Sequence, residues 1–314
     1  MYEVFSAALS AMLTMFSCMA VGFILRKRRL EPEDTDSVLS KLLNYAICPA
    51  LTFTTMAQNF SISSISQNYK LVLFSGVLMV SAMLLSGPLS RLFCKEGYTR
   101  NVYKYALVFA NSGYMGNAIV LALFNTEILY YYLLFTMPQT IGIYTWGMAQ
   151  LVPGKSGLKG TLLRFLNPNT IALVLGIIVG ALGITPYIPG FIDSALVNLG
   201  NCLGPIAMVL TGYVVGKYDL KKMLTNKGVY FASLLRLIVL PGLFCAVLVL
   251  LGVDRLTTTL ALIAFGMPLG LNTVVFPAAY DKDTSIGAGM SLISTVLSVI
   301  LFPLMYMVFT SLFA

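Results

Sequence analysis

The sequence predicts an all-α polytopic membrane protein with ten transmembrane helices, arranged as two inverted repeats of five. Three observations lead to this prediction. The 314 residues are 58% apolar and only 10% charged, with a mean hydropathy of +0.86, whereas soluble domains are about 25% charged. Many apolar runs are long enough to cross a bilayer, which takes about 20 residues. The Lys and Arg residues fall in alternate loops.

Apolar runs separated by charged residues or by Gly, Pro and Asn clusters delimit the predicted spans. The first run is long enough to be a mature helix rather than a removed signal peptide. The ten spans are residues 4–25, 37–58, 70–93, 102–124, 128–151, 169–188, 191–216, 229–252, 256–280 and 285–313.

Several spans contain proline, which removes a backbone hydrogen bond and kinks or breaks a helix. Within lipid, such breaks survive only where protein or a cavity satisfies the freed backbone groups. We expect helix breaks or hinges at Pro49, Pro205 and Pro268.

The charge distribution predicts the orientation. Every Lys and Arg except Lys70, Arg236 and Arg255 falls in or beside the loops after the odd-numbered spans. The positive-inside rule therefore places these loops in the cytoplasm and both termini outside the cytoplasmic membrane. The net charge of +8 has the same explanation, and no basic stripe with interleaved aromatic residues indicates nucleic-acid binding.

The segment 152–168 divides the chain into halves of five spans, 1–151 and 169–314. Because five is odd, the halves would lie in opposite orientations, so a duplicated unit would be an inverted repeat. Residues 43–49 and 199–205 both begin with Leu, contain Asn and Cys, and end with Pro. A chance coincidence of proline is the alternative explanation.

Spans four and nine are interrupted near mid-depth by Gly, Asn, Ser and Pro, which are poor helix formers and, for Asn, costly in lipid. Matched interruptions in two halves indicate discontinuous helices, whose half-helix N-termini direct partial positive charge toward the midplane. Such a site suits a carboxylate bound by backbone N–H groups and Asn amides. Alternatively, these Gly residues allow close packing and the Asn residues bridge helices. The candidate substrate-binding residues are Asn111, Gly113, Gly116, Asn117, Pro268 and Asn272.

Charged residues within the spans are few. All twelve Asp and Glu residues fall in loops or at span ends, which argues against a cation antiporter with a buried carboxylate but leaves open sodium held by carbonyls and Asn. Arg236 either snorkels to the interface or attracts an anion. Trp146 and Tyr130 to Tyr132 are interpreted as interfacial anchors, and Ser291, Ser294 and Ser298 as a packing face.

The sequence contains no recognisable motif for catalysis or for binding a cofactor. It contains no His, so His-ligated metals and His acid–base chemistry are excluded. Its five Cys are scattered and form no CxxC pair. The GxSxG, HExxH and Walker A patterns are absent. We therefore expect no metal, no cofactor and no enzymatic activity.

Short motifs in a specific order resemble the auxin efflux carrier family, which includes plant auxin exporters and bacterial malate and malonate permeases. The resemblance covers nearly the whole chain. Where the family usually has Pro after the Gly of its first crossover, this chain has Asn117, which either alters that break or adds an amide donor. The motifs are Leu42–Tyr45, Cys48–Leu51, Asn111–Gly116, Asn167–Gly176, Leu199–Gly200, Pro205–Met208, Gly212–Gly216 and Met267–Asn272.

The resemblance implies a fold akin to bile-acid sodium symporters and sodium–proton antiporters. In that fold a scaffold domain and a transport domain are interleaved across both halves, and the transport domain carries two crossed, broken helices. It also implies homodimers, an elevator mechanism, and transport of small organic anions such as malate-like carboxylates or indole-type acids. The alternatives are a receptor or sensor that binds such a ligand without moving it, and a sodium-coupled organic anion symporter.

Overall fold

The computed structural model describes residues 2–30, 32, 34–152, 167–219, 225–278 and 282–311. Within these ranges the chain forms helices and no strand, so the all-α prediction is confirmed. Of the predicted linker 152–168, only residues 152, 167 and 168 lie within the described residues.

The helices of the first half begin at the N-terminus and end near residue 151. The π-helical segments η1, η2 and η3 each continue into the α-helix that follows them. The elements are α1 (Tyr2–Arg28), α2 (Thr35–Leu42), η1 (Leu43–Ile47), α3 (Cys48–Asn59), α4 (Ile62–Ser90), α5 (Tyr98–Val108), η2 (Ser112–Gly116), α6 (Asn117–Leu123), α7 (Thr126–Gly142), η3 (Ile143–Gly147) and α8 (Met148–Leu151).

The second half has a similar order, with a short 3-10 helix, η4, and one π-helical segment, η5. Its elements are α10 (Pro168–Ala181), η4 (Thr185–Tyr187), α11 (Gly190–Asn201), α12 (Leu203–Gly216), α14 (Lys227–Leu234), η5 (Leu235–Val239), α15 (Leu240–Leu250), α16 (Arg255–Gly266), α17 (Asn272–Ala278) and α18 (Ser285–Ser311).

Six helical segments among the described residues are long and apolar enough to cross a membrane. Large apolar side chains are exposed along them, such as Leu84 at 73% and Leu250 at 85%, as expected for a surface whose solvent is lipid. The six segments are Tyr2–Arg28, Asn68–Ser90, Tyr98–Leu123, Gly190–Gly216, Lys227–Leu250 and Ser285–Ser311.

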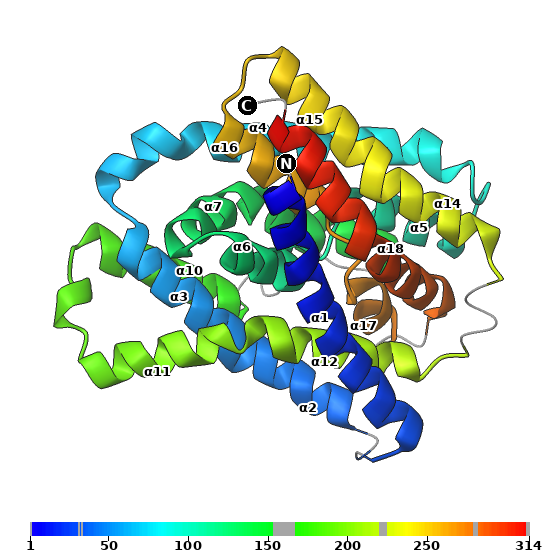
Figure 1. Cartoon of the computed structure of the whole chain (residues 1–314), viewed down its shortest axis with the longest axis horizontal. Helices are drawn as coiled ribbons and strands as arrows, with labels where there is room; N and C mark the ends of the chain where they lie inside the picture. The colour runs from blue at the N-terminus through cyan, green and yellow to red at the C-terminus, as the bar shows by residue number, and fades with distance from the viewer. Residues whose placement is uncertain are drawn as a thin grey trace.

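Helices from the two halves of the chain pack against each other. α1 crosses α12, and α3 lies along α10 and α11 (Figure 1). At the first crossing a Cβ atom added to Gly22 would lie 1.9 Å from the carbonyl oxygen of Val209, and one on Gly212 would lie 1.8 Å from that of Met19. Glycine is therefore required for this close approach of the two backbones.

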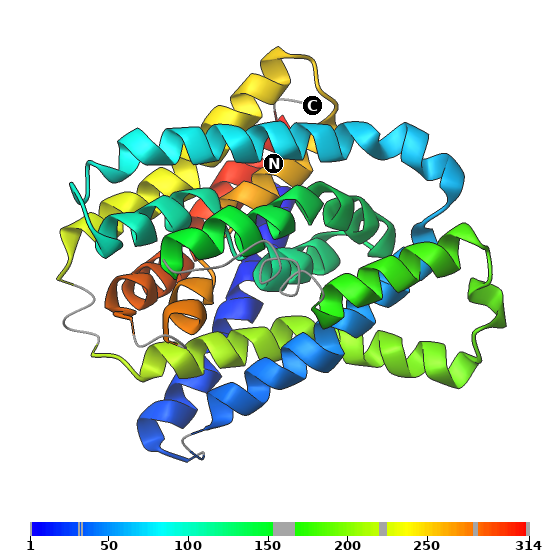
Figure 2. The same ribbon diagram turned by 180° about the vertical axis from the view of Figure 1, so that it is seen from behind.

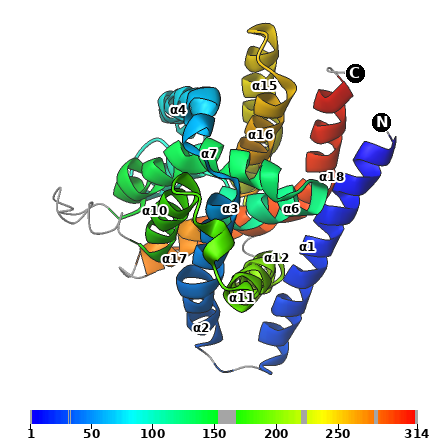
Figure 3. The same ribbon diagram turned by 90° about the vertical axis from the view of Figure 1, so that its left-hand side faces the viewer.

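A second group of helices surrounds the interrupted spans. α4 lies across the back of the molecule over α7 (Figure 2), and it also contacts α5, while α14 packs on α18 and α15 on α16. The N-terminal end of α1 and the C-terminal end of α18 lie at the same end of the molecule (Figure 3). The interrupted segments α5–η2–α6 and α16–α17 lie inside this second group.

Two of the expected interfacial tyrosines are buried instead. Tyr130 and Tyr132 are 2% and 0% exposed, so their interpretation as interfacial anchors is wrong. The Tyr132 hydroxyl donates to the carbonyl oxygen of Ser112 at 3.2 Å, which supplies the partner that a buried phenol requires. Trp146 is half-buried, with its ring 6.0 Å from that of Phe109.

Pro49 and Pro205 lie at the beginnings of helices. Pro49 is the second residue of α3, which directly follows η1, so helix runs without interruption from Thr35 to Asn59. Pro205 lies in the first turn of α12, just after an interruption at Cys202. Proline fits a first helical turn because its missing N–H has no intrahelical partner there.

Gly212→Ala should destabilise the protein, because the new Cβ atom collides with the α1 backbone and forces the helices apart. Overpacking of this kind costs about 1–3 kcal/mol, so the melting temperature in detergent should fall. Gly76→Ala in α4 is the matched control, since a Cβ atom added there would have no described atom within 4 Å. An equal melting temperature for the two variants would contradict the close crossing.

Candidate functional site

The two interrupted helices touch at their breaks. α5 ends at Val108 and α16 at Gly266, and in each case the next residue, Phe109 or Met267, is extended. Met267 precedes proline, which disfavours helical geometry at that position. The N–H of Asn111 donates to the carbonyl oxygen of Pro268 at 2.8 Å. This backbone hydrogen bond joins the two breaks directly.

Side chains of α18 satisfy further backbone groups of the second break. Ser294 Oγ accepts a hydrogen bond from the N–H of Leu269 at 3.0 Å, and Ser291 Oγ donates to the carbonyl oxygen of Leu269 at 3.0 Å. Both serines are fully buried. Two of the three serines interpreted as a packing face therefore substitute for helical hydrogen bonds that the break removes.

Arg236 connects the C-terminal ends of both half-helices. It is 1% exposed, and its guanidinium donates to the carbonyl oxygen of Ala106 in α5 and, at 3.2 Å, to that of Met267 after α16. The snorkelling interpretation is therefore wrong. A cation at a helix C-terminus is favourable because the free carbonyls carry partial negative charge. Here one guanidinium interacts with the C-terminal ends of two helices.

A polar cavity of about 350 Å³ lies beside the crossing. The helix breaks contribute Asn111, Asn117 and Asn272, and the opposite wall, from η1, α3 and α10, contributes Asn44, Thr52 and Asn169. None of the lining residues in the described part of the chain is charged. The cavity thus offers several neutral donors and acceptors inside an otherwise apolar helical protein.

The predicted site residues divide into two sets. Asn111, Gly113, Asn117 and Asn272 line the cavity, whereas Gly116 and Pro268 do not. Gly116 instead makes room for a buried phenol, since an added Cβ atom would lie 2.0 Å from the Tyr132 hydroxyl. Pro268 contributes its carbonyl oxygen to the backbone bond between the breaks.

Hydrogen bonds hold several of the cavity's side chains. Asn272 Nδ2 donates to the Tyr105 hydroxyl at 3.1 Å, and the Tyr114 hydroxyl donates to Asn44 Oδ1 at 2.9 Å. Asn117 is 7% exposed, and its Oδ1 has no partner among the described residues. Unpaired polar atoms of this kind are rare in native structures and call for an explanation.

The opposite wall was missed by the sequence reasoning. Thr52 Oγ1 donates to Asn169 Oδ1 at 2.7 Å, which joins α3 to α10 beside the cavity. A signal did exist for Asn169, because it belongs to the motif that opens the second half. Tyr114 and Tyr144 also line the cavity. Helical periodicity does not predict this, because both residues lie in π-helical segments, where the π turns decide which way a side chain faces.

All four π-helical segments among the described residues belong to this region. Residues of η1, η2 and η3 line the cavity, and η5 carries Arg236. A π turn shifts the register of the following residues, and such turns occur frequently at functional sites. The N–H groups of Ser112, Gly113 and Tyr114 precede the first intrahelical bonds of η2, which Met115 and Gly116 donate to the carbonyl oxygen of Asn111.

Interrupted helices around a polar cavity are the architecture of a membrane transporter. The profile of the family described as membrane transport proteins matches residues 7–162 and 155–306. The chain belongs to this family, the auxin efflux carrier family. It is also similar to an uncharacterized transporter of Methanothermobacter thermautotrophicus, with 23% identity over 306 residues that cover 96% of this chain and 98% of the relative.

Arg236→Met should destabilise the protein more than Arg236→Lys. Methionine leaves two buried carbonyl groups without a donor, at about 1–3 kcal/mol for each, whereas lysine keeps the charge and reaches one of them. Thermal unfolding of both variants in the same detergent measures the difference. If Arg236→Met melts at the temperature of the unchanged protein, Arg236 does not stabilise the crossing.

Proposed function

We propose that this transporter is a permease for small organic anions with a single carboxylate charge. The observation that carries the proposal is the uncharged polar cavity beside two crossed, interrupted helices. Its volume of about 350 Å³ is in the range of small-molecule sites. The family resemblance suggests malate-like carboxylates and indole-type acids, and of these the indole-type acids carry one carboxylate charge whereas malate carries two.

The carboxylate would be bound by amide and backbone donors. The side chains of Asn111, Asn117 and Asn272 line the cavity, and Ser112 and Gly113 add N–H groups from the start of the helical run Ser112–Leu123. Such N–H groups and the helix dipole favour an anion. The side-chain oxygen of Asn117, which has no described partner, would rotate away when the amide nitrogen donates to a substrate.

The charge of Arg236 supports a monoanion over a dianion. The guanidinium stays protonated in proteins, and no described carboxylate pairs with it. Ala106 and Met267, which it contacts, precede the cavity-lining Asn111 and Gly270 by five and three residues. One bound negative charge balances this buried positive charge, whereas a second would be left without a counter-charge in a low-dielectric site.

The proposed topology is ten spans in two inverted repeats, 1–151 and 169–314, with both termini on the extracellular side of the cytoplasmic membrane. The fourth helical segment of each half is the interrupted one, and the two family matches meet at residues 155–162. The ends of α1 and α18 lie at one end of the molecule (Figure 3), as an even number of spans requires. The resemblance further suggests a homodimer.

An elevator movement fits the arrangement of the cavity. One side of the cavity belongs to the interrupted helices and α7, and the other to η1, α3 and α10. Sliding of the interrupted helices and α7 along η1, α3 and α10 would carry the substrate without unfolding either set of helices. Because no described carboxylate is buried where it could bind a coupling ion, the anion's own gradient would drive its transport. One charge in 100 mV is worth about 2.3 kcal/mol, so an inside-negative cell would favour export.

Sodium-coupled symport is the second candidate, and one observation favours it. Asn117 Oδ1 is a buried oxygen without a described partner, and neutral oxygens can ligate a cation in place of a carboxylate. A strict requirement for a sodium gradient in proteoliposomes would establish this candidate. Binding without any counterflow would instead indicate a receptor.

Counterflow of a labelled monocarboxylate into proteoliposomes should occur, and Asn111→Ala should weaken it. Loss of one donor to a charged acceptor costs about 1.5–3 kcal/mol, which is about ten- to a hundredfold in affinity. Asn111→Asp should be worse, because it opposes the anion with a negative charge. Affinity is measured by competition in the counterflow assay.

Asn59→Ala is the matched control for Asn111→Ala, since Asn59 bonds to the carbonyl oxygen of Thr55 away from the cavity. Its substrate affinity should equal that of the unchanged protein. Affinity left intact in Asn111→Ala would refute the crossover site. A lower melting temperature with unchanged affinity would instead assign Asn111 a packing role.

Tyr2→Cys and Arg28→Cys should be labelled from opposite sides of the membrane, because they mark the two ends of α1 and both side chains are exposed. Each cysteine is introduced into a protein that lacks the five native Cys. An impermeant maleimide applied to whole cells that express these variants should modify position 2 and not position 28. Modification of position 28 but not position 2 from outside would reverse the proposed orientation.

A further inference from the structure

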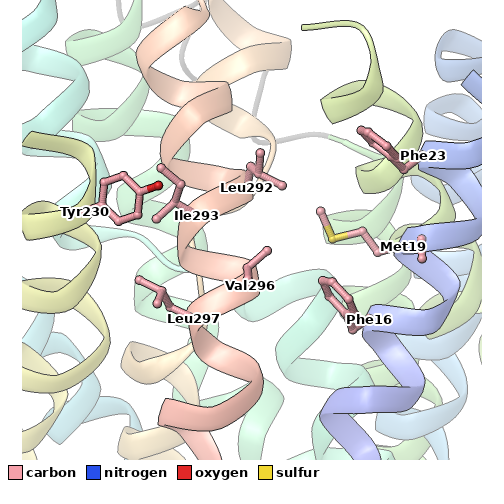
Figure 4. Close-up of a pocket in the computed structure, with 9 residues that line it drawn as sticks. Phe16, Met19, Phe23, Tyr230, Leu292, Ile293, Val296 and Leu297 are labelled. Carbon is pink, nitrogen blue, oxygen red and sulfur yellow. The ribbon is translucent and has the colours of Figure 1, made fainter. Parts of the chain in front are cut away.

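A second cavity, separate from the polar one, opens as a groove between α1, α14 and α18. Its volume is about 360 Å³, and the Tyr230 hydroxyl is the one side-chain oxygen or nitrogen among its described lining residues. Figure 4 shows Phe16, Met19 and Phe23 of α1 on one side and α18 in the centre. Tyr230 of α14 lies beyond α18, next to Ile293 (Figure 4). The groove therefore suits an apolar occupant.

The groove lies at the depth of the membrane's hydrocarbon. All three of its helices belong to segments that are long and apolar enough to span a bilayer. Val296 on its floor is 45% exposed, so the groove is open toward the outside of the helix bundle. Phe16 and Phe23 are two helical turns apart, about 10 Å along the axis, which gives the groove an elongated form.

Positive charge marks one end of the groove. Lys27 follows Phe23 by one turn on the same face of α1, with its Nζ 5.5 Å from the centre of the Phe23 ring and 3.4 Å from the carbonyl oxygen of Tyr218. Lys27 is exposed.

Acidic neighbours near this end have partners of their own. Asp283 accepts hydrogen bonds from the N–H and hydroxyl of Ser285, and Asp36 pairs with Lys217 at 2.7 Å. The ammonium group of Lys27 forms no described ion pair. The positive-inside rule places this end at the cytoplasmic leaflet, whose surface carries anionic lipids.

We propose that the groove binds one acyl chain of an anionic glycerophospholipid, with its phosphate group beside Lys27. An apolar channel that ends in a cation matches the two parts of such a lipid. The chain fills space that would otherwise lack contacts on one side, and the phosphate is attracted to the lysine ammonium.

The lipid would lie at the seam between the two groups of helices. α1 packs tightly on α12, while α14 continues into the segment that carries Arg236 and α18 supplies the serines of the second break. An acyl chain at this seam would be displaced or dragged when one group slides along the other. Only this consequence rests on the proposed transport function; lipid binding itself does not.

Fluorescence quenching by lipids with brominated acyl chains tests the proposal. Trp146 is the single Trp, so Phe16→Trp in a Trp146→Phe background places one probe in the groove with an aromatic replacement. At equal mole fraction, brominated phosphatidylglycerol should quench this probe at least twofold more strongly than brominated phosphatidylcholine. Ala20→Phe, which fills the groove, should remove the difference.

Lys27→Gln should also abolish the preference for phosphatidylglycerol. Arg28→Gln is the matched control, because it removes an exposed cation at the same end of α1 but outside the groove. Equal quenching by the two lipids in the Phe16→Trp protein would overturn the proposal. So would a preference that survives loss of Lys27. Neither readout depends on transport, so a failed counterflow assay leaves this test intact.

Discussion

The structure depends on satisfying the backbone groups of two interrupted helices far from water. Arg236 donates to the carbonyl oxygens of Ala106 and Met267, so one guanidinium caps the C-terminal ends of both α5 and α16. Without such partners, each unsatisfied backbone group would destabilise the fold in lipid by several kcal/mol. The buried cation is therefore the condition that allows both helices to stop in the middle of the protein.

The remaining groups of the breaks are satisfied without charge. The N–H of Asn111 donates to the carbonyl oxygen of Pro268. Two serines of α18, Ser291 and Ser294, form hydrogen bonds with the backbone of Leu269. The crossing is thus held on one side by α18 and on another by η5. The cavity lies beside the crossing, and Asn117, whose Oδ1 has no described partner, lines it. A polar opening inside an apolar protein follows from this division of partners.

The two groups of helices meet at two seams of different chemistry. Where η1, α3 and α10 face the breaks, the seam contains the polar cavity, and the Tyr114–Asn44 bond crosses it. Where α1 faces α14 and α18, the seam contains the apolar groove. The close contact of Gly22 and Gly212 fixes α1 on α12. A small organic ligand suits the first seam, and a lipid chain suits the second.

The sequence by itself determined the class of the protein, most helix limits and the place of both breaks, because hydropathy and the Gly, Asn and Pro of Asn111–Asn117 and Met267–Asn272 act locally along the chain. Tertiary structure alone decided the role of Arg236, since its partners lie 130 and 31 positions away. It also decided that Tyr132 is buried and that Ser294 accepts a hydrogen bond from the backbone N–H of Leu269. A single-sequence pattern reports the period of a helix, whereas π-helical turns and the pairing of distant elements set which side chain faces the cavity.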